Sequence, residues 1–104
     1  MDRFHFLGFP PHKKGRQTYF DEVATLEDSV IFFESPHRII KTLVELSSRE
    51  PKRLAMIGRE LTKLHETIYR GTLAELNTVI GQEPSRGEYV VVLAPQKMSH
   101  SPLS

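Results

Sequence analysis

Three short apolar runs, rich in β-branched and aromatic residues, require this chain to build its core around a β-sheet. They are Val30–Phe33, which predicts a strand buried on both faces, Leu54–Ile57 and Tyr89–Leu93. The aromatic run Phe4–Phe9 is stopped by Pro10-Pro11, and it predicts a further strand that leads into a turn.

Amphipathic segments separate the predicted strands. Apolar residues recur at helical spacing after Gly15, which predicts a helix that ends near Leu26. Ser35-Pro36 predicts the start of a second helix, because serine can cap free backbone N–H groups and proline at the first helical position loses no hydrogen bond. Pro51 ends this helix, and its predicted buried stripe comprises Ile39, Ile40, Leu43, Val44 and Leu46.

The second half of the chain adds a strand and a helix. Thr67–Arg70 is a predicted strand that follows another strand with no helix between them, which favours a mixed sheet. Thr72 and Glu75 match a capping box, so a third helix is expected through Ile80. The predicted fold class is α/β: a single α/β/α-type domain over residues 1–95, with a mixed sheet of about five strands and three main helices, before a disordered tail over residues 96–104.

The composition limits the classes of function. The chain has 104 residues, a formal net charge of +1 and no cysteine, which excludes a disulfide framework, thiolate chemistry and a general basic field. No run approaches the roughly 20 apolar residues of a membrane span, so a cytoplasmic protein is expected. Binding to nucleic acid would have to rest on the local cluster His12–Arg16, whose cations are Lys13, Lys14 and Arg16.

The stretch Glu34–Arg38 is the first candidate site. It follows a predicted buried strand and opens a predicted helix, which is where open α/β sheets bind ligands. Free N–H groups there favour an anionic or carbonyl-type ligand, and the potential cations His37 and Arg38 also favour a negative group nearby. The alternative is that Ser35 only caps the helix and Arg38 pairs with a surface carboxylate.

The stretch Arg59–Glu66 is the second candidate site, because it places both charge signs, a hydroxyl and an imidazole directly after a predicted core strand. Arg59 and Lys63 could donate hydrogen bonds to phosphate, and Glu60 could accept one. A salt-bridged loop would have the same composition, so this stretch alone leaves both interpretations open.

Other common site types find no support in the sequence. The histidines form no closely spaced pair, so no metal site is predicted. The chain contains no G-x-S-x-G, G-x-G-x-x-G or P-loop motif, which leaves hydrolase, dinucleotide-binding and NTPase functions without support.

Several motifs nevertheless occur together in a specific order. They are Phe6–Pro10, Phe33–Arg38, Arg59–Glu66, Arg70–Leu76 and Gly87-Glu88. On these motifs the chain resembles, from Phe4 to Leu93, the C-terminal half of the small-subunit ribosomal RNA (cytidine-2′-O-)-methyltransferases, in the tetrapyrrole (corrin/porphyrin) methylase superfamily. One departure is Pro10, which stands where the family often has leucine and implies a stiffer turn before the basic loop.

The resemblance implies a fold, a cofactor and partners. Enzymes of this family have two α/β domains and bind S-adenosylmethionine in the cleft between them, and this chain would be the second domain without the first. The implied substrate is ribosomal RNA of the small subunit, the implied partner is the missing N-terminal methylase domain, and a homodimer is possible because the superfamily is often dimeric. The isolated domain is expected to be inactive.

The resemblance also implies roles for single residues. The residues placed next to the cofactor are Glu34, Ser35, Pro36, Leu61 and Thr62. Those placed on the substrate side are His37, Arg38, Arg59, Lys63 and His65, with Lys13, Lys14 and Arg16 of the basic loop. The catalytic candidates are Arg38, Glu60 and Lys63, and no general base is assigned among them.

Two alternatives stay open from the sequence. A tetrapyrrole methyltransferase would need an apolar, planar cleft wall, whereas Arg38, Arg59 and Lys63 favour phosphate groups. A non-catalytic RNA-binding module would be favoured if no methylase domain preceded this chain.

Overall fold

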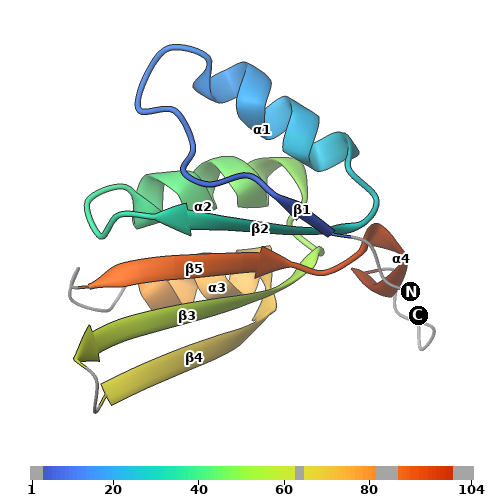
Figure 1. Ribbon diagram of the computed structural model, residues 1–104. Coiled ribbons are helices and arrows are strands. Elements are labelled where there is room, and N and C mark those ends of the chain that lie inside the picture. Colours follow the sequence, from blue (N-terminus) through green and yellow to red (C-terminus); the bar gives the residue numbers. More distant parts are fainter. Residues whose placement is uncertain (1–3, 63–64, 82–86, 100–104) are drawn as a thin grey trace.

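The computed structural model describes residues 4–62, 65–81 and 87–99, with side chains except those of residues 60–62, 65–66 and 98–99. These residues form a five-stranded sheet, drawn as arrows in Figure 1. The strands are β1 (Phe4–Phe6), β2 (Ser29–Glu34), β3 (Leu54–Thr62), β4 (His65–Thr72) and β5 (Glu88–Leu93).

The strands lie in the order β1-β2-β5-β3-β4. β1 is parallel to β2, whereas the other neighbouring pairs are antiparallel, so the predicted mixed sheet is confirmed. Because β5 runs against both β2 and β3, the carboxyl ends of these two strands meet the amino end of β5 at one edge. We call this the loop edge, and it is where Glu34, Thr62 and Glu88 lie.

Three main helices pack on the sheet, as predicted. They are α1 (Arg16–Thr25), α2 (Ile39–Arg49) and α3 (Leu73–Ile80), and Figure 1 shows α2 and α3 behind the sheet. Each helix contributes buried apolar side chains to a single core, for example Phe20 from α1, Leu43 from α2 and Leu76 from α3. The core therefore lies on one face of the sheet.

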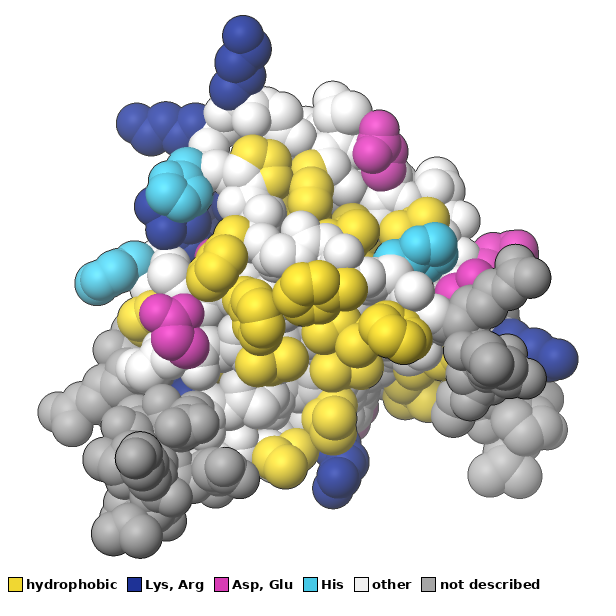
Figure 2. Space-filling view, viewed as in Figure 1, with side chains coloured by type: hydrophobic (Ala, Val, Ile, Leu, Met, Phe, Trp, Pro, Cys, Tyr) yellow, Lys and Arg dark blue, Asp and Glu magenta, His cyan; other side chains and the backbone are white. Residues whose placement is uncertain are grey.

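No helix in the described part of the chain covers the opposite face of the sheet, which we call the open face. Along β2, Val30 and Phe32 are buried, whereas the alternating residues Ile31 and Phe33 are only half-buried, because successive side chains point to opposite faces of a strand. The predicted burial of β2 on both faces is therefore wrong. Figure 2 shows a patch of hydrophobic side chains on the open face. Within the described residues the arrangement is two-layered, which refines the expected α/β/α type.

The start of α2 differs from the prediction. The helix begins at Ile39 with Arg38 at the N-cap, and no side chain caps it. Ser35 contributes its backbone carbonyl oxygen instead, which accepts hydrogen bonds from the N–H groups of Arg38 at 3.1 Å and Ile39 at 3.0 Å. The prolyl turn thus precedes the helix, and the prediction that the Ser35 side chain caps it is wrong.

The buried stripe of α2 is narrower than predicted. Ile39, Leu43 and Leu46 are fully buried, whereas Ile40 and Val44 are exposed. The buried residues follow the i, i+4, i+7 spacing of one helix face, and Ile40 and Val44 lie beside that face. Apolar character alone therefore overestimated the buried surface.

Strands β3 and β4 are longer than predicted. The polar stretch Arg59–Glu66 was expected to be a loop, yet Arg59 pairs with Thr67 and Glu60 pairs with Glu66. The register shifts between Glu60 and Thr62, which marks an irregularity close to the loop edge. A hairpin that extends beyond the core does not need apolar residues, which is why its polar sequence concealed the strands.

The capping box of α3 is confirmed. The Glu75 N–H donates to Thr72 Oγ1 at 3.2 Å, and the Thr72 N–H donates to Glu75 Oε1 at 2.8 Å. The hydrogen bond from the Thr72 backbone holds the pKa of the Glu75 carboxyl below its usual value. Two free N–H groups at the start of α3 are satisfied in this way.

The predicted disordered tail is wrong at its beginning. Gln96–Ser99 forms the short helix α4, and residues 100–104 lie outside the described residues. The Gln96 backbone N–H donates to the Glu27 carbonyl at 2.8 Å, and its side-chain amide donates to Ala24 O at 3.1 Å and to the Glu50 carboxylate. These contacts tie the chain after β5 to the end of α1.

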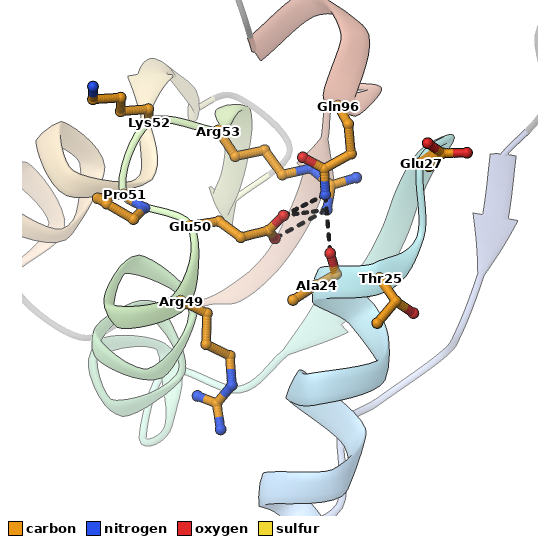
Figure 3. A pocket seen from close by; sticks show the side chains of 9 residues that line it. All are labelled: Ala24, Thr25, Glu27, Arg49, Glu50, Pro51, Lys52, Arg53 and Gln96. Atoms are coloured by element: carbon orange, nitrogen blue, oxygen red, sulfur yellow. Dashed lines mark hydrogen bonds and ion pairs between the residues drawn. The ribbon is translucent and has the colours of Figure 1, made fainter.

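Arg53 connects several chain segments at the edge of the sheet opposite the loop edge. Its side chain lines a pocket of about 570 Å³ beside Gln96 and Glu50, and its Nη1 lies 3.0 Å from Glu50 Oε2 (Figure 3). Arg53 is 2% exposed, and its guanidinium donates to four backbone carbonyl oxygens, those of Val23, Leu26, Asp28 and Ala94. A single cation thus joins the end of α1, the start of β2 and the end of β5.

We predict that Arg53→Met lowers the free energy of unfolding by about 3 to 5 kcal/mol, because it removes the cation that neutralises the partly buried Glu50 carboxylate and one hydrogen bond to each of four carbonyl oxygens. Urea denaturation followed by circular dichroism measures this loss. The matched control is Lys52→Met, an exposed cation one residue away, which should change stability by less than about 0.5 kcal/mol. Equal stability of the two variants would show that Arg53 is not the structural anchor.

Candidate functional site at the loop edge

The loop edge aligns residues from the two stretches that the sequence singles out. Glu34 of β2 pairs with Tyr89 of β5, and Tyr89 pairs on its other side with Arg59 of β3. Directly paired residues point to the same face of a sheet, so the three side chains form one row on the helix side, about 10 Å long. All three are buried. The fold thus brings Glu34 and Arg59 together from distant parts of the sequence.

Glu34 supports the turn that follows β2. Its side chain is 1% exposed, and both carboxylate oxygens accept hydrogen bonds. Oε1 accepts from the Ser35 backbone N–H at 2.9 Å, and Oε2 accepts from the Thr42 hydroxyl at 2.5 Å. Because a buried carboxylate needs such donors, this geometry favours an indirect role for Glu34 over the predicted contact with a cofactor.

Arg16 is directed into the protein, although the sequence suggested an RNA contact. It is 3% exposed, its Nη2 lies 2.8 Å from Glu45 Oε2 and 2.9 Å from Thr42 Oγ1, and its Nη1 donates to the Pro11 carbonyl at 2.9 Å. The guanidinium carbon lies 4.9 Å from the centre of the Phe20 ring. This burial is at odds with a role in binding RNA. Arg16 instead links the loop before α1 to α2 in the interior.

Thr42, a residue of this interior, was not predicted from the sequence to take part in a site. Thr42 is fully buried and lies on the apolar face of α2 between Ile39 and Leu43. A hydroxyl on a predicted buried stripe was the signal that could have found it. The Tyr19 hydroxyl is buried and makes no hydrogen bond within the described residues.

Burial raises the pKa of the Tyr19 hydroxyl to about 12, with a further increase from the negative charge of Glu34 and an opposing effect of Arg16. The Tyr19 hydroxyl is therefore neutral at physiological pH.

The turn after β2 faces outward from this buried support. His37 is exposed, and Ser35, Pro36 and Arg38 are partly exposed. Arg38 Nη1 donates to Ser35 Oγ at 3.0 Å, which fixes the guanidinium over the turn. These four predicted site residues are accessible to a ligand, unlike Glu34.

The basic loop lies beside this turn. Lys13 and Lys14 are exposed, which an RNA contact would require, and Gly15 joins them to α1 with a φ of 84° that favours glycine. The Phe33 N–H donates to the Gly8 carbonyl at 2.8 Å, which holds the start of this loop along β2. Figure 2 shows Lys, Arg and His side chains together at the upper left, over the loops that follow β1 and β2.

The second predicted stretch is described only in part. Arg59 is 8% exposed and points to the helix side of the sheet, so within the described structure it is less accessible than predicted for a substrate contact. The backbone of Glu60, Leu61, Thr62 and His65 lies in β3 and β4, but their side chains are outside the described residues, as is the whole of Lys63.

The described part of the chain contains neither a cluster of metal-binding side chains nor a membrane-spanning helix. No group of three or more His, Asp or Glu side chains there could hold a metal ion. None of its helices has the length and apolar character needed to cross a membrane.

Comparison with curated proteins finds similarity along nearly the whole chain. It is 41% identical over 105 aligned residues to the ribosomal RNA small subunit methyltransferase I of Neisseria meningitidis, covering 97% of this chain and 36% of that protein. The proteins of the same name from Erythrobacter litoralis and Helicobacter pylori are 39% and 34% identical, with 90% and 91% of this chain covered. The chain spans about a third of the length of these relatives.

The fold also matches a solved structure. A cobalamin biosynthetic enzyme, cobalt precorrin-4 methyltransferase, superimposes on 96% of this chain with a TM-score of 0.65. The sequences are 12% identical and the match covers 42% of that enzyme, so the likeness concerns the fold alone. No protein family model matches the chain.

We predict that the unfolding free energy falls as the pH rises from about 10 to about 12, in part because Tyr19 ionises more readily in the unfolded chain than in the folded one. The stabilising contribution is complete below pH 10 and is lost as the pH passes the raised pKa. Tyr19→Phe should reduce this fall. At pH 7 it should change stability by less than about 1 kcal/mol, because the hydroxyl it removes has no hydrogen bond.

Urea denaturation at pH 8 and pH 11 measures both effects. Tyr69→Phe is the matched control, since it removes a different phenol from the chain and should leave the contribution of Tyr19 in place. If Tyr19→Phe is as sensitive to alkali as the unmodified chain, the described environment of Tyr19 is incorrect.

Proposed function

We propose that this chain, a relative of the ribosomal RNA small subunit methyltransferases I along nearly its whole length, forms one wall of an S-adenosylmethionine-dependent methyltransferase site. The proposed reaction is methylation of the 2′-hydroxyl of a cytidine ribose in small-subunit ribosomal RNA. The observation that carries the proposal is the accessible Ser35–Arg38 turn at the loop edge, in a chain with 34–41% identity to enzymes of that name.

The loop edge supports different roles for its residues. Ser35 and Pro36, with Leu61 and Thr62 from the end of β3, are proposed to face the cofactor, which would supply a methyl group on a sulfonium when bound. His37 and Arg38, with Lys13 and Lys14, offer cations and donors that suit RNA phosphates. The proposed catalytic candidates remain Arg38, Glu60 and Lys63, and His65 and Arg59 are proposed to act beside them.

Positioning would be the main contribution of this wall. Transfer of a methyl group needs the attacking hydroxyl and the methyl carbon held in line, and holding two reactants in place removes much of the barrier. Arg38 is fixed by its bond to Ser35, so it can hold a phosphate at a constant distance from the turn. Arg16 and Glu34, which are buried, are proposed to support this wall without touching the reactants.

The second wall is proposed to lie in a part of the protein that this chain does not include. The relatives are about three times as long as the chain, which supports a second, N-terminal methylase domain that completes the cleft. The complete enzyme is proposed to act in the cytoplasm on small-subunit RNA.

We predict that Arg38→Ala lowers kcat/KM for methyl transfer by roughly ten- to hundredfold, because it removes one charge-assisted contact with the RNA. The assay uses a chimeric protein in which this chain replaces the segment of the Neisseria meningitidis relative that it matches. Transfer of tritium from labelled S-adenosylmethionine to unmodified small ribosomal subunits is measured.

Lys52→Ala is the control, because it removes an exposed cation at the opposite edge of the sheet. Full activity of the Arg38→Ala chimera would remove Arg38 from the site. No methyl transfer by a folded chimera without substitutions would contradict the proposed function itself.

The open face of the sheet supports a further partner, a second copy of the chain. Phe4, Phe6 and Ile68 are 61%, 56% and 51% exposed on or beside this face, and burying such apolar area against an equal surface would be favourable. We predict that Phe6→Asp weakens self-association in sedimentation-equilibrium measurements. Val79→Asp, which alters an exposed apolar residue on α3, should not, and equal effects of both changes would contradict a dimer through this face.

A further inference from the structure

A continuous chain of hydrogen bonds runs through the interior from the basic loop to the turn after β2. It starts at the Pro11 carbonyl, which accepts from Arg16, and it passes from Arg16 to Thr42 and from Thr42 to Glu34. It ends at the Ser35 N–H, which donates to Glu34. We call this set the Arg16–Thr42–Glu34 relay.

We propose that Arg16 and Thr42 are positioning residues of the methyltransferase site, which act through the relay on the Ser35–Arg38 turn. This inference rests on the proposed function for its effect on catalysis. The two residues touch neither reactant, because Arg16 is 3% exposed and Thr42 is 0% exposed.

The chemistry of Thr42 makes it the central member of the relay. A hydroxyl can accept one hydrogen bond and donate another, so Thr42 accepts from the Arg16 cation at 2.9 Å and donates to the Glu34 carboxylate at 2.5 Å. Valine has nearly the same shape and can do neither. Serine retains both capacities and loses only a methyl group.

Arg16 fixes the relay at its other end. Its guanidinium joins the loop before α1 to α2, because it donates to the Pro11 carbonyl and, on α2, to Thr42 and the Glu45 carboxylate. The Glu45 carboxylate neutralises the buried cation, so the relay carries no uncompensated positive charge. Lysine would keep the charge but lacks the planar fork that makes these contacts together.

The effect on the turn follows from the carboxylate of Glu34. Its Oε1 holds the Ser35 N–H at 2.9 Å, and the Thr42 hydroxyl fixes the rotation of the same carboxylate through Oε2. Losing the Thr42 hydroxyl frees this rotation, which shifts Ser35 and the Arg38 guanidinium bonded to its side chain. A shift of about 1 Å in a positioning group can reduce a rate by a factor of roughly one hundred.

The test compares Thr42→Val with Thr42→Ser in the chimeric protein described above. Thr42→Val is expected to lower kcat/KM for methyl transfer by roughly ten- to hundredfold, and Thr42→Ser is expected to restore most of it. Thr78→Val, which removes an exposed threonine hydroxyl from α3, is the control and should stay fully active. If Thr42→Val prevents folding, Arg16→Lys takes its place and should give the same loss.

A second readout does not depend on activity. In the amide NMR spectrum of this chain, Thr42→Val should move the Ser35 and Arg38 resonances, whereas those of Thr67–Thr72 in β4 should stay in place. Thr42→Ser should move them far less. A merely structural defect would instead spread over the whole core.

The outcomes separate the two proposals. An active Thr42→Val chimera with an unchanged Ser35 resonance would overturn the relay and leave the proposed function intact. A folded chimera that is inactive without any substitution would overturn the proposed function, and the NMR comparison would then decide alone whether the relay holds the turn.

Discussion

β5 pairs with β2 on one side and with β3 on the other, and this placement decides where the polar residues of the chain lie. Because β5 runs against both strands, their carboxyl ends are brought to one edge of the sheet. Glu34, Tyr89 and Arg59 then form a row on the helix side, although they come from three separate parts of the sequence. Without this register the Ser35–Arg38 turn and the end of β3 would not lie at the same edge of the sheet.

The polar residues divide between the interior and the surface according to this geometry. Arg16, Thr42 and Glu34 are buried on the helix side and linked by hydrogen bonds, whereas the Ser35–Arg38 turn leaves the sheet and is accessible. The buried Glu34 carboxylate therefore holds the backbone of the turn at Ser35, and the side chains of the turn remain accessible to a ligand. At the opposite edge, Arg53 donates hydrogen bonds to four backbone carbonyl oxygens. That edge therefore stabilises the fold, whereas the loop edge carries the candidate site.

The sequence predicted the elements of this fold better than it predicted the roles of single side chains. The apolar runs and the capping box of Thr72 located strands and helices, because burial and free N–H groups act locally. The burial of Arg16 could not be predicted, because its partners Thr42 and Glu45 lie on another helix and meet it only after packing. The hairpin at Arg59 was missed for the opposite reason, since its pairing satisfies the backbone without apolar side chains.

The central claim is that this chain supplies one wall of a methyltransferase site whose other wall lies elsewhere in the protein. Calorimetric titration of S-adenosylmethionine into this chain and into the chimera with the Neisseria meningitidis relative tests it most directly. We expect the chimera to bind S-adenosylmethionine, and this chain alone to bind it at least about a hundredfold more weakly, or by roughly 2.7 kcal/mol. Equal affinity of the two proteins would contradict a shared site.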